Sequence, residues 1–174
     1  MSELIAILQR LPGLTDADPH ALADLAAHMK RRSYKDEVIC KEGEQADRLW
    51  VLASGSAEVL KRSETGREFV VATLSPVCLF GHVGLFTSGG RTATVRAAGL
   101  AEVLQMSSTQ AHLVLRSSSQ IVGGPFRRAL IVALSQQLTA ATQTLWRLAD
   151  ELGTTEALPP EEVERKLSSA NSKV

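Results

Sequence analysis

Cysteine is scarce in this sequence, with two residues, Cys40 and Cys78, among 174. Both lie in apolar runs, and a disulfide framework or a cysteine metal site needs more cysteines at close spacing. We therefore expect two small, buried core residues. Long apolar runs are also missing: no stretch approaches the ~20 residues that span a bilayer. The N-terminus lacks the basic start and apolar core of a signal peptide. These absences predict a cytoplasmic protein without a membrane segment.

An excess of charge of either sign is absent as well. The chain has 19 basic and 19 acidic side chains and a formal net charge of zero. This balance argues against a protein built to coat nucleic acid or an anionic membrane. Hydrophobic residues make up 44% of the chain, an ordinary globular composition. The length suffices for one domain with its own core.

Closely spaced histidines are missing too. Jelly-roll enzymes of the cupin type hold a catalytic metal with a His-x-His pair and further ligands. The four histidines here, His20, His28, His82 and His112, are far apart. No Ser/His/Asp or Cys/His arrangement follows from the spacing either. We therefore expect no catalytic residues, no metal and no enzymatic activity.

Helical periodicity marks the start of the chain. Apolar residues recur at helical spacing over residues 1–14 and stop at Pro12-Gly13. The run from Thr15 to Pro19 supplies N-cap candidates and a proline suited to a first helical turn. We expect the second helix to end at about Arg32, where Lys30-Arg31-Arg32 would place positive charge at the negative end of the helix dipole.

The pattern changes to short strands between Ser33 and Ser107. Turn residues such as Ser54-Gly55-Ser56 and Ala98-Gly99 separate the candidates. Many short strands with regular turns, and no helix-length segments between them, indicate a sandwich or jelly-roll barrel and disfavour a parallel α/β sheet. The candidate strands are residues 38–40, 49–52, 57–60, 69–72, 93–95 and 103–106.

Helical periodicity returns after Ser107, with a short helix over 108–116 and a long helix from about 126 to 152. We expect Gly123-Gly124-Pro125 to interrupt or bend the chain and to act as a hinge. A two-in-seven apolar seam on the long helix favours a coiled-coil homodimer over packing on its own barrel. Its residues are Ile131, Leu134, Leu138, Ala141, Leu145, Leu148 and Leu152. The predicted domain is thus 1–152, and residues 153–174 form a flexible polar tail.

The most informative segment runs from Phe80 to Ala93. Gly81 permits close approach of the backbone to a ligand. A helix start after it would offer unpaired N–H groups to an anion. Arg91 can hold a phosphate with two parallel hydrogen bonds, and Thr92 adds a hydroxyl donor. Taken alone, the segment fits a structural glycine turn followed by an arginine at a strand edge better than it fits a binding site.

The order of motifs over Leu11–Leu152 resembles the cyclic nucleotide-binding domain family of the catabolite-activator type. The matching stretches are 11–15, 41–47, 49–59, 64–68, 80–85 and 90–97. The resemblance implies an α+β fold: an eight-stranded β-roll, or jelly-roll barrel, at about 33–107 with flanking helices. It implies cAMP, cGMP or another nucleotide as ligand, and a long helix that dimerises and caps it. The implied phosphate-binding cassette comprises Gly81, His82, Val83, Arg91, Thr92 and Ala93.

His82 departs from the family's pattern, which has a glutamate that accepts a hydrogen bond from the ribose 2′-hydroxyl. A neutral imidazole still offers one acceptor, whereas a protonated one would favour a more anionic ligand. Losing one such bond costs about 0.5–1.5 kcal/mol, a weakening on the tenfold scale. Two other places depart from the family's pattern: the pair Val77-Cys78, which follows Pro76, and Gly84. Three outcomes follow: weak cyclic-nucleotide binding, binding of another nucleotide, or a ligand-free interaction domain.

The sequence as a whole predicts a stand-alone regulatory or sensor module. It would signal to an unidentified protein partner through the C-terminal helix or tail. The alternative is a ligand-free domain that acts as a protein–protein scaffold. The roughly 22 residues after Leu152 are too few for the winged helix-turn-helix of related transcription factors. We therefore expect no DNA-binding domain.

Overall fold

The computed structural model describes residues 2–87, 89–117 and 120–151. The chain forms two compact units, residues 1–136 and 137–174. The first unit holds every strand described below, three helices and the first part of the long helix. Leu152 and the expected tail at 153–174 lie outside the described residues, so the tail and the domain boundary at 152 stay predictions.

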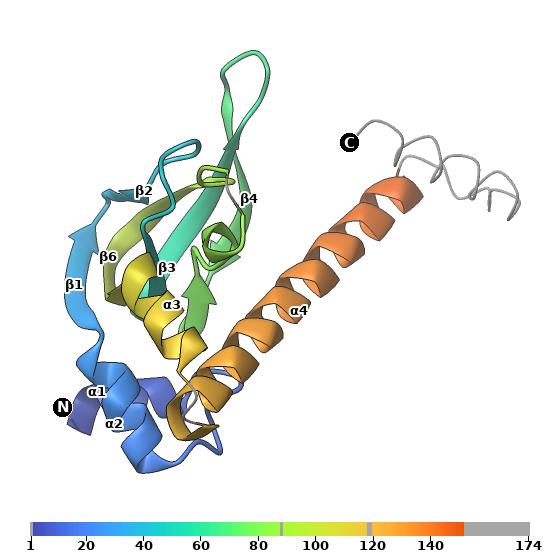
Figure 1. Cartoon of the computed structure of the whole chain (residues 1–174). Helices are drawn as coiled ribbons and strands as arrows, with labels where there is room; N and C mark the ends of the chain where they lie inside the picture. The colour runs from blue at the N-terminus through green and yellow to red at the C-terminus, as the bar shows by residue number, and fades with distance from the viewer. Residues whose placement is uncertain (1, 88, 118–119, 152–174) are drawn as a thin grey trace, which may run out of the picture. The chain divides into compact units, whose positions relative to one another are not determined.

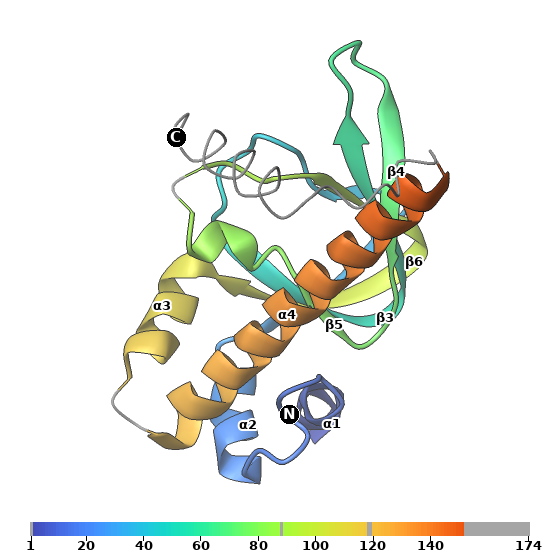
Figure 2. The same cartoon turned by 90° about the vertical axis from the view of Figure 1, so that its right-hand side faces the viewer.

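Two short helices, α1 (Ser2–Gln9) and α2 (Pro19–Ala27), lie together at one end of the sheet (Figures 1 and 2). The expected cap is present, because the Asp18 side chain accepts a hydrogen bond from the backbone N–H of His20 and Pro19 occupies the first turn. The predicted end near Arg32 is wrong: α2 stops at Ala27, and Lys30 already begins a strand. The three cations therefore do not stabilise the helix terminus.

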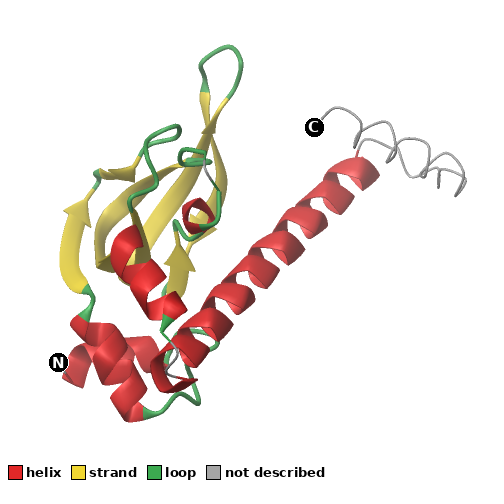
Figure 3. Ribbon diagram, viewed as in Figure 1, coloured by secondary structure: helices red, strands yellow, loops and turns green. Residues whose placement is uncertain are grey.

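The strands form one antiparallel sheet (Figure 3). Its backbone order is β1-β6-β3-β4, with β2 paired to β6 and β5 paired to β3. Strands β1 and β4 do not pair with each other, so the sheet is open in the described residues rather than a closed barrel. The strands are β1 (Lys30–Lys35), β2 (Val38–Cys40), β3 (Arg48–Arg62), β4 (Glu68–Leu74), β5 (Cys78–Phe80) and β6 (Thr94–Ser107).

The described residues contain six strands where the resemblance implied eight, because two expected turns lie inside long strands. Gly55 and Gly99 have φ of +78° and +74°. The register of β3 against β6 shifts on both sides of Ser54, so at Gly55 the backbone bulges and continues instead of reversing. Each long strand joins two predicted short strands. Strand β3 includes the predicted strands 49–52 and 57–60. Strand β6 includes 103–106 and, except for Ala93, the predicted strand 93–95.

Strand β5 was not predicted from the sequence, and neither was strand β1. Its residues, Lys-Arg-Arg-Ser-Tyr-Lys, are exposed except for Tyr34, which is half-buried. Such a segment shows no apolar alternation. Its strand form comes from hydrogen bonding to β6 in continuous register, from Lys30 opposite Gln105 to Lys35 opposite Leu100.

Two apolar clusters lie on opposite faces of the sheet. Leu49, Val51 and Leu104 pack against the helices, together with Phe126 of the long helix. Trp50, with alternate residues of β3 and β6, packs on the other face. This division follows from the alternation of side chains along a strand. Cys40 is buried as expected, whereas Cys78 is half-buried, and both are free thiols.

The helices after the sheet are α3 (Ser108–Arg116), as predicted, and α4 (Gln120–Glu151). Ser107 and Gln110 form a reciprocal capping box that fixes the start of α3. The predicted interruption at Gly123-Gly124-Pro125 is wrong, since α4 begins before it and runs through it. Pro125 is the sixth residue of α4 and lies beyond the first four N–H groups, which have no intrahelical partner, so the proline removes one backbone hydrogen bond without ending the helix.

Candidate functional site

The expected glycine turn is present and tightly packed. Strand β5 pairs with β3 so that Phe80 lies opposite Trp50, and the two rings stack with centroids 5.3 Å apart. Gly81 follows with φ of +72°, and a Cβ there would lie 2.7 Å from the Trp50 ring. Only glycine fits both the backbone conformation and the space. The helix after it, η1 (Val83–Leu85), has three residues and therefore adds little dipole for an anion.

Arg91 lies inside the protein, with a relative exposure of 6%. Its guanidinium donates to the carbonyl oxygens of Gly81 at 3.0 Å and of Arg48 at 2.6 Å. It also stacks on the Trp50 ring, 4.7 Å from the centroid. One Nη lies 3.6 Å from Asp47 Oδ1. The arginine thus ties the cassette turn to the start of β3 with its own hydrogen bonds.

The surroundings of Arg91 balance its charge only partly. Burial lowers the pKa of its guanidinium, while Cys40, Asp47 and Glu44 act in the opposite direction. Its backbone is fixed as well, since the Arg91 N–H donates to the Glu44 carbonyl and the Gly43 N–H donates to the Arg91 carbonyl. Beside it lies a hollow of about 270 Å³, lined by Ile39, Cys40, Glu44, Gln45, Asp47, Arg48, Trp50 and Arg91.

His82 is also buried, with a relative exposure of 4%. Neither ring nitrogen has a hydrogen-bond partner among the described residues. Burial lowers the pKa of the imidazole, so the ring is neutral at pH 7. A buried donor and acceptor without partners is unfavourable by about 1–3 kcal/mol. His82 therefore differs sharply from Arg91, although both lie in the predicted cassette.

The remaining cassette residues are more accessible. Thr92 is exposed, and Val83 and Ala93 are half-buried. The structure joins Gly81 to Arg91 directly, but Thr92 contacts a different residue, since its carbonyl accepts a hydrogen bond from Lys61. Sequence reasoning missed Trp50 and the Arg48 carbonyl as partners of Arg91. No spacing signal could have found them, because β3 approaches the cassette only through the pairing of the folded sheet.

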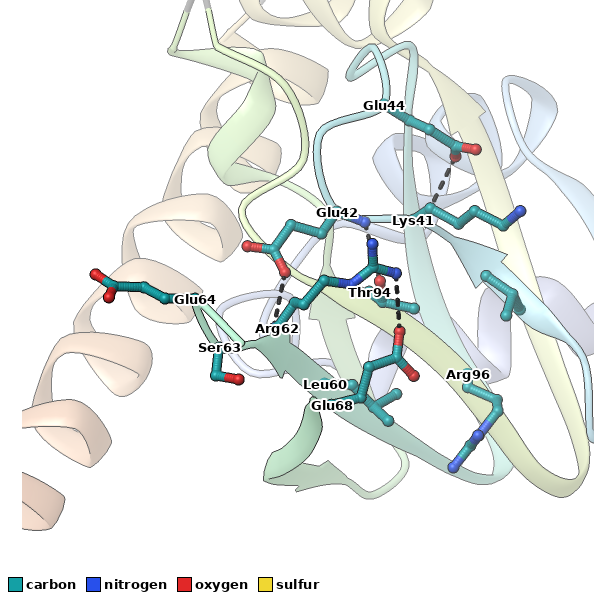
Figure 4. Close-up of a pocket in the computed structure, with 11 residues that line it drawn as sticks. Lys41, Glu42, Glu44, Leu60, Arg62, Ser63, Glu64, Glu68, Thr94 and Arg96 are labelled. Carbon is teal, nitrogen blue, oxygen red and sulfur yellow. Dashed lines mark hydrogen bonds and ion pairs between the residues drawn. The ribbon is translucent and has the colours of Figure 1, made fainter. Parts of the chain in front are cut away.

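A larger hollow, of about 570 Å³, shares only Glu44 with the hollow beside Arg91 (Figure 4). None of the six predicted cassette residues lines it. The Arg62 guanidinium donates to the Glu68 carboxylate, and the Arg62 backbone N–H donates to the Glu42 carboxylate, which also pairs with Lys61. Its residues are Val38, Lys41, Glu42, Glu44, Leu60, Arg62, Ser63, Glu64, Glu68, Thr94 and Arg96. Its mixed, internally paired charges define no single ligand class.

Three further features concern metal binding, the membrane and the long helix. No group of His, Cys, Asp and Glu in the described residues could hold a metal ion. Among the same residues, no helix combines the length and apolarity needed to cross a membrane. The predicted seam of α4 is largely exposed, with Ile131 at 63%, Leu138 at 69% and Leu145 at 68%.

Several known proteins are similar to this chain in sequence and in fold. The family model for the cyclic nucleotide-binding domain matches residues 30–118, just over half of the chain. A cAMP-dependent protein kinase regulatory subunit from Blastocladiella emersonii is 30% identical over 54% of this chain and 24% of its own length. The cAMP-activated global transcriptional regulator Vfr of Pseudomonas aeruginosa is 31% identical, over 58% and 50%. The chain thus spans between a quarter and a half of these relatives.

Solved structures show the same fold. The c-di-GMP-responsive global regulator CLP of Xanthomonas campestris superposes with a TM-score of 0.68 at 25% identity, covering 76% of this chain and 65% of that one. A cyclic nucleotide-binding domain from Methylobacillus flagellatus gives a TM-score of 0.73 at 16% identity, over 84% and 83%. With the family model matched across the sheet and the cassette, this chain belongs to the cyclic nucleotide-binding domain family.

Proposed function

We propose that this protein is a regulatory module that binds a nucleotide in the Gly81–Ala93 cassette and signals to a protein partner through α4. Family membership supports this, as do relatives named as regulatory subunits or transcriptional regulators. cAMP and cGMP are the first candidate ligands. A cyclic dinucleotide is the next, because one structural relative is described as responsive to c-di-GMP.

The observation that carries the proposal is the direct bond between Arg91 and Gly81 across the cassette. This bond keeps the buried Arg91 guanidinium beside the glycine turn, where the proposal puts the phosphate of the ligand. A phosphate could take the place of the Gly81 or Arg48 carbonyl as acceptor, since a charged acceptor forms the stronger bond. Ligand binding would then loosen the tie between the turn and β3, and so change the structure around Trp50.

We further propose that the exposed seam of α4 forms a homodimer. In the single chain, the exposed fraction of the large apolar side chains of the seam ranges from 37% at Leu134 to 69% at Leu138, and a coiled-coil partner would cover them. Analytical ultracentrifugation at micromolar concentration should show a dimer. A monomer would contradict the dimer but leave nucleotide binding untouched.

Isothermal titration calorimetry with cAMP, cGMP and cyclic di-GMP tests ligand binding. Thr92→Ala should weaken binding several-fold without unfolding the protein, because the Thr92 side chain is exposed. Thr109→Ala, at an exposed position on α3, is the matched control. His82→Glu should increase affinity by about tenfold, since a carboxylate accepts a ribose hydroxyl better than an unpaired neutral ring.

A ligand-free scaffold is the second candidate, favoured by the internal bonding of Arg91 and the burial of His82. In that case no nucleotide binds at millimolar concentration, in the wild type or in His82→Glu. Arg91 variants would then change stability and nothing else.

A further inference from the structure

A third hollow, of about 400 Å³, carries charge of only one sign. The cations are Lys30 and Arg32 of β1 and Arg48 of β3, and no carboxylate lines it among the described residues. The rest of its lining is uncharged: Tyr34, Gln105, Ser107 and Gln110. The volume falls within the range of small-molecule sites.

The strand register explains why these side chains converge. Lys30, Arg32 and Tyr34 are alternate residues of β1 and therefore lie on one face. Lys30 is opposite Gln105, and Arg48 is opposite Ser107, so both belong to the same face across β6. Further along, this face is filled by Trp50 and Val103 of the second apolar cluster. The hollow is thus a polar continuation of a buried face.

The charges of Lys30 and Arg32 have no partner in the described residues. Neither side chain makes an ion pair or hydrogen bond there, although Arg31 between them binds both Glu3 and Glu102. The carboxylates of Glu3 and Glu102 therefore pair with the face of β1 opposite to that of Lys30 and Arg32. Arg48 pairs with Asp47 at 3.2 Å, but both side chains are half exposed, and such a pair contributes little and exchanges readily.

This pattern differs from that of the larger hollow in Figure 4, where arginines pair with glutamates. Like charges gathered without counter-ions repel one another and disfavour folding. We propose that this hollow binds a compact polyanion with two or more phosphate groups. Arg32 and Arg48 offer planar donors suited to phosphate oxygens, and Lys30 adds a point charge.

Calorimetric titration of the full chain with inorganic tripolyphosphate tests the site. Lys30→Gln with Arg32→Gln should reduce the affinity about tenfold or more, because two charge-assisted contacts are lost. The matched control, Lys35→Gln with Arg67→Gln, removes the same charge from exposed positions outside the hollow. It should change the affinity less than twofold. Shifts in the NMR signal of the Gln105 side-chain amide should report occupancy.

Three results would overturn the proposal. They are absence of tripolyphosphate binding at millimolar concentration, equal weakening in the control pair, and tighter binding of an acidic peptide such as hexaglutamate. Nucleotide binding in the cassette is measured separately with the same variants and should stay unchanged. Failure at one site is therefore distinguishable from failure at the other.

Discussion

Two groups of cations in this protein have opposite environments. Arg91 is 6% exposed and donates to two backbone carbonyls, whereas Lys30 and Arg32 are exposed and unpaired in the described residues. The sequence motif shows that an arginine is present at position 91. Burial and hydrogen-bond partners decide whether its charge is available to bind a ligand. The contacts of Arg91 stabilise the fold, whereas Lys30 and Arg32 keep their charges available for the proposed polyanion.

Arg91→Ala should cause the largest loss of stability, about 3 kcal/mol. The substitution leaves the Gly81 and Arg48 carbonyls without a donor and empties the space over Trp50. Urea denaturation at neutral pH measures the change. Arg48→Ala is the control and should lose less than about 0.5 kcal/mol, since its ion pair is exposed. Equal losses would remove the distinction between the two arginines.

Gly81→Ala should destabilise by about 2–3 kcal/mol. The alanine would have to adopt a left-handed backbone conformation, and its Cβ would lie 2.7 Å from the Trp50 ring. Arg91 stacks on the same ring, so a shift of Trp50 would also disturb Arg91. Gly66→Ala separates the two effects, because Gly66 has φ of +82° but nothing within 4 Å of its Cβ. It should lose about 1 kcal/mol. Thermal denaturation of both variants checks the difference, and a Gly81 variant no worse than Gly66→Ala would refute the crowding.

His82 should make stability depend on pH near neutrality. Burial lowers its pKa in the folded state below the ordinary 6.5, so the unfolded chain binds the extra proton first. The free energy of unfolding therefore falls as pH drops through 6.5, by up to about 1.4 kcal/mol per pH unit. Above 6.5 this contribution is fully present.

Urea titrations between pH 7.5 and 5.5 test this, with His82→Leu expected to lose that slope. His112→Gln is the control, because His112 is exposed on α3. The same slope in the wild type and in His82→Leu would show that other groups cause it.

Arg32→Gln should have the smallest effect, within about 0.5 kcal/mol of the wild type, because the side chain is exposed and unpaired. Differential scanning calorimetry at low salt measures it. A loss above 1 kcal/mol would mean that Arg32 holds the fold together rather than serving a ligand.

Local sequence signals located most elements. The Asp18 cap, α3 and the apolar stretches of β3 and β6 were found because cap chemistry and alternation are properties of neighbouring residues. Strands β1 and β5 were not predicted, and Gly55 and Gly99 were wrongly predicted to end strands. Whether a glycine bends a strand or ends it depends on what pairs alongside.

The sequence by itself determined the family, the antiparallel sheet and the cassette's residue types, since motif order and alternation are written along the chain. Only the tertiary structure decided that Arg91 donates to two backbone carbonyls and stacks on Trp50. It also decided that the His82 ring has no hydrogen-bond partner among the described residues, and that three cations line one hollow. The reason is physical: hydrogen bonding, desolvation and charge clustering depend on which distant strands meet, and pairing between β1, β6 and β3 sets those distances.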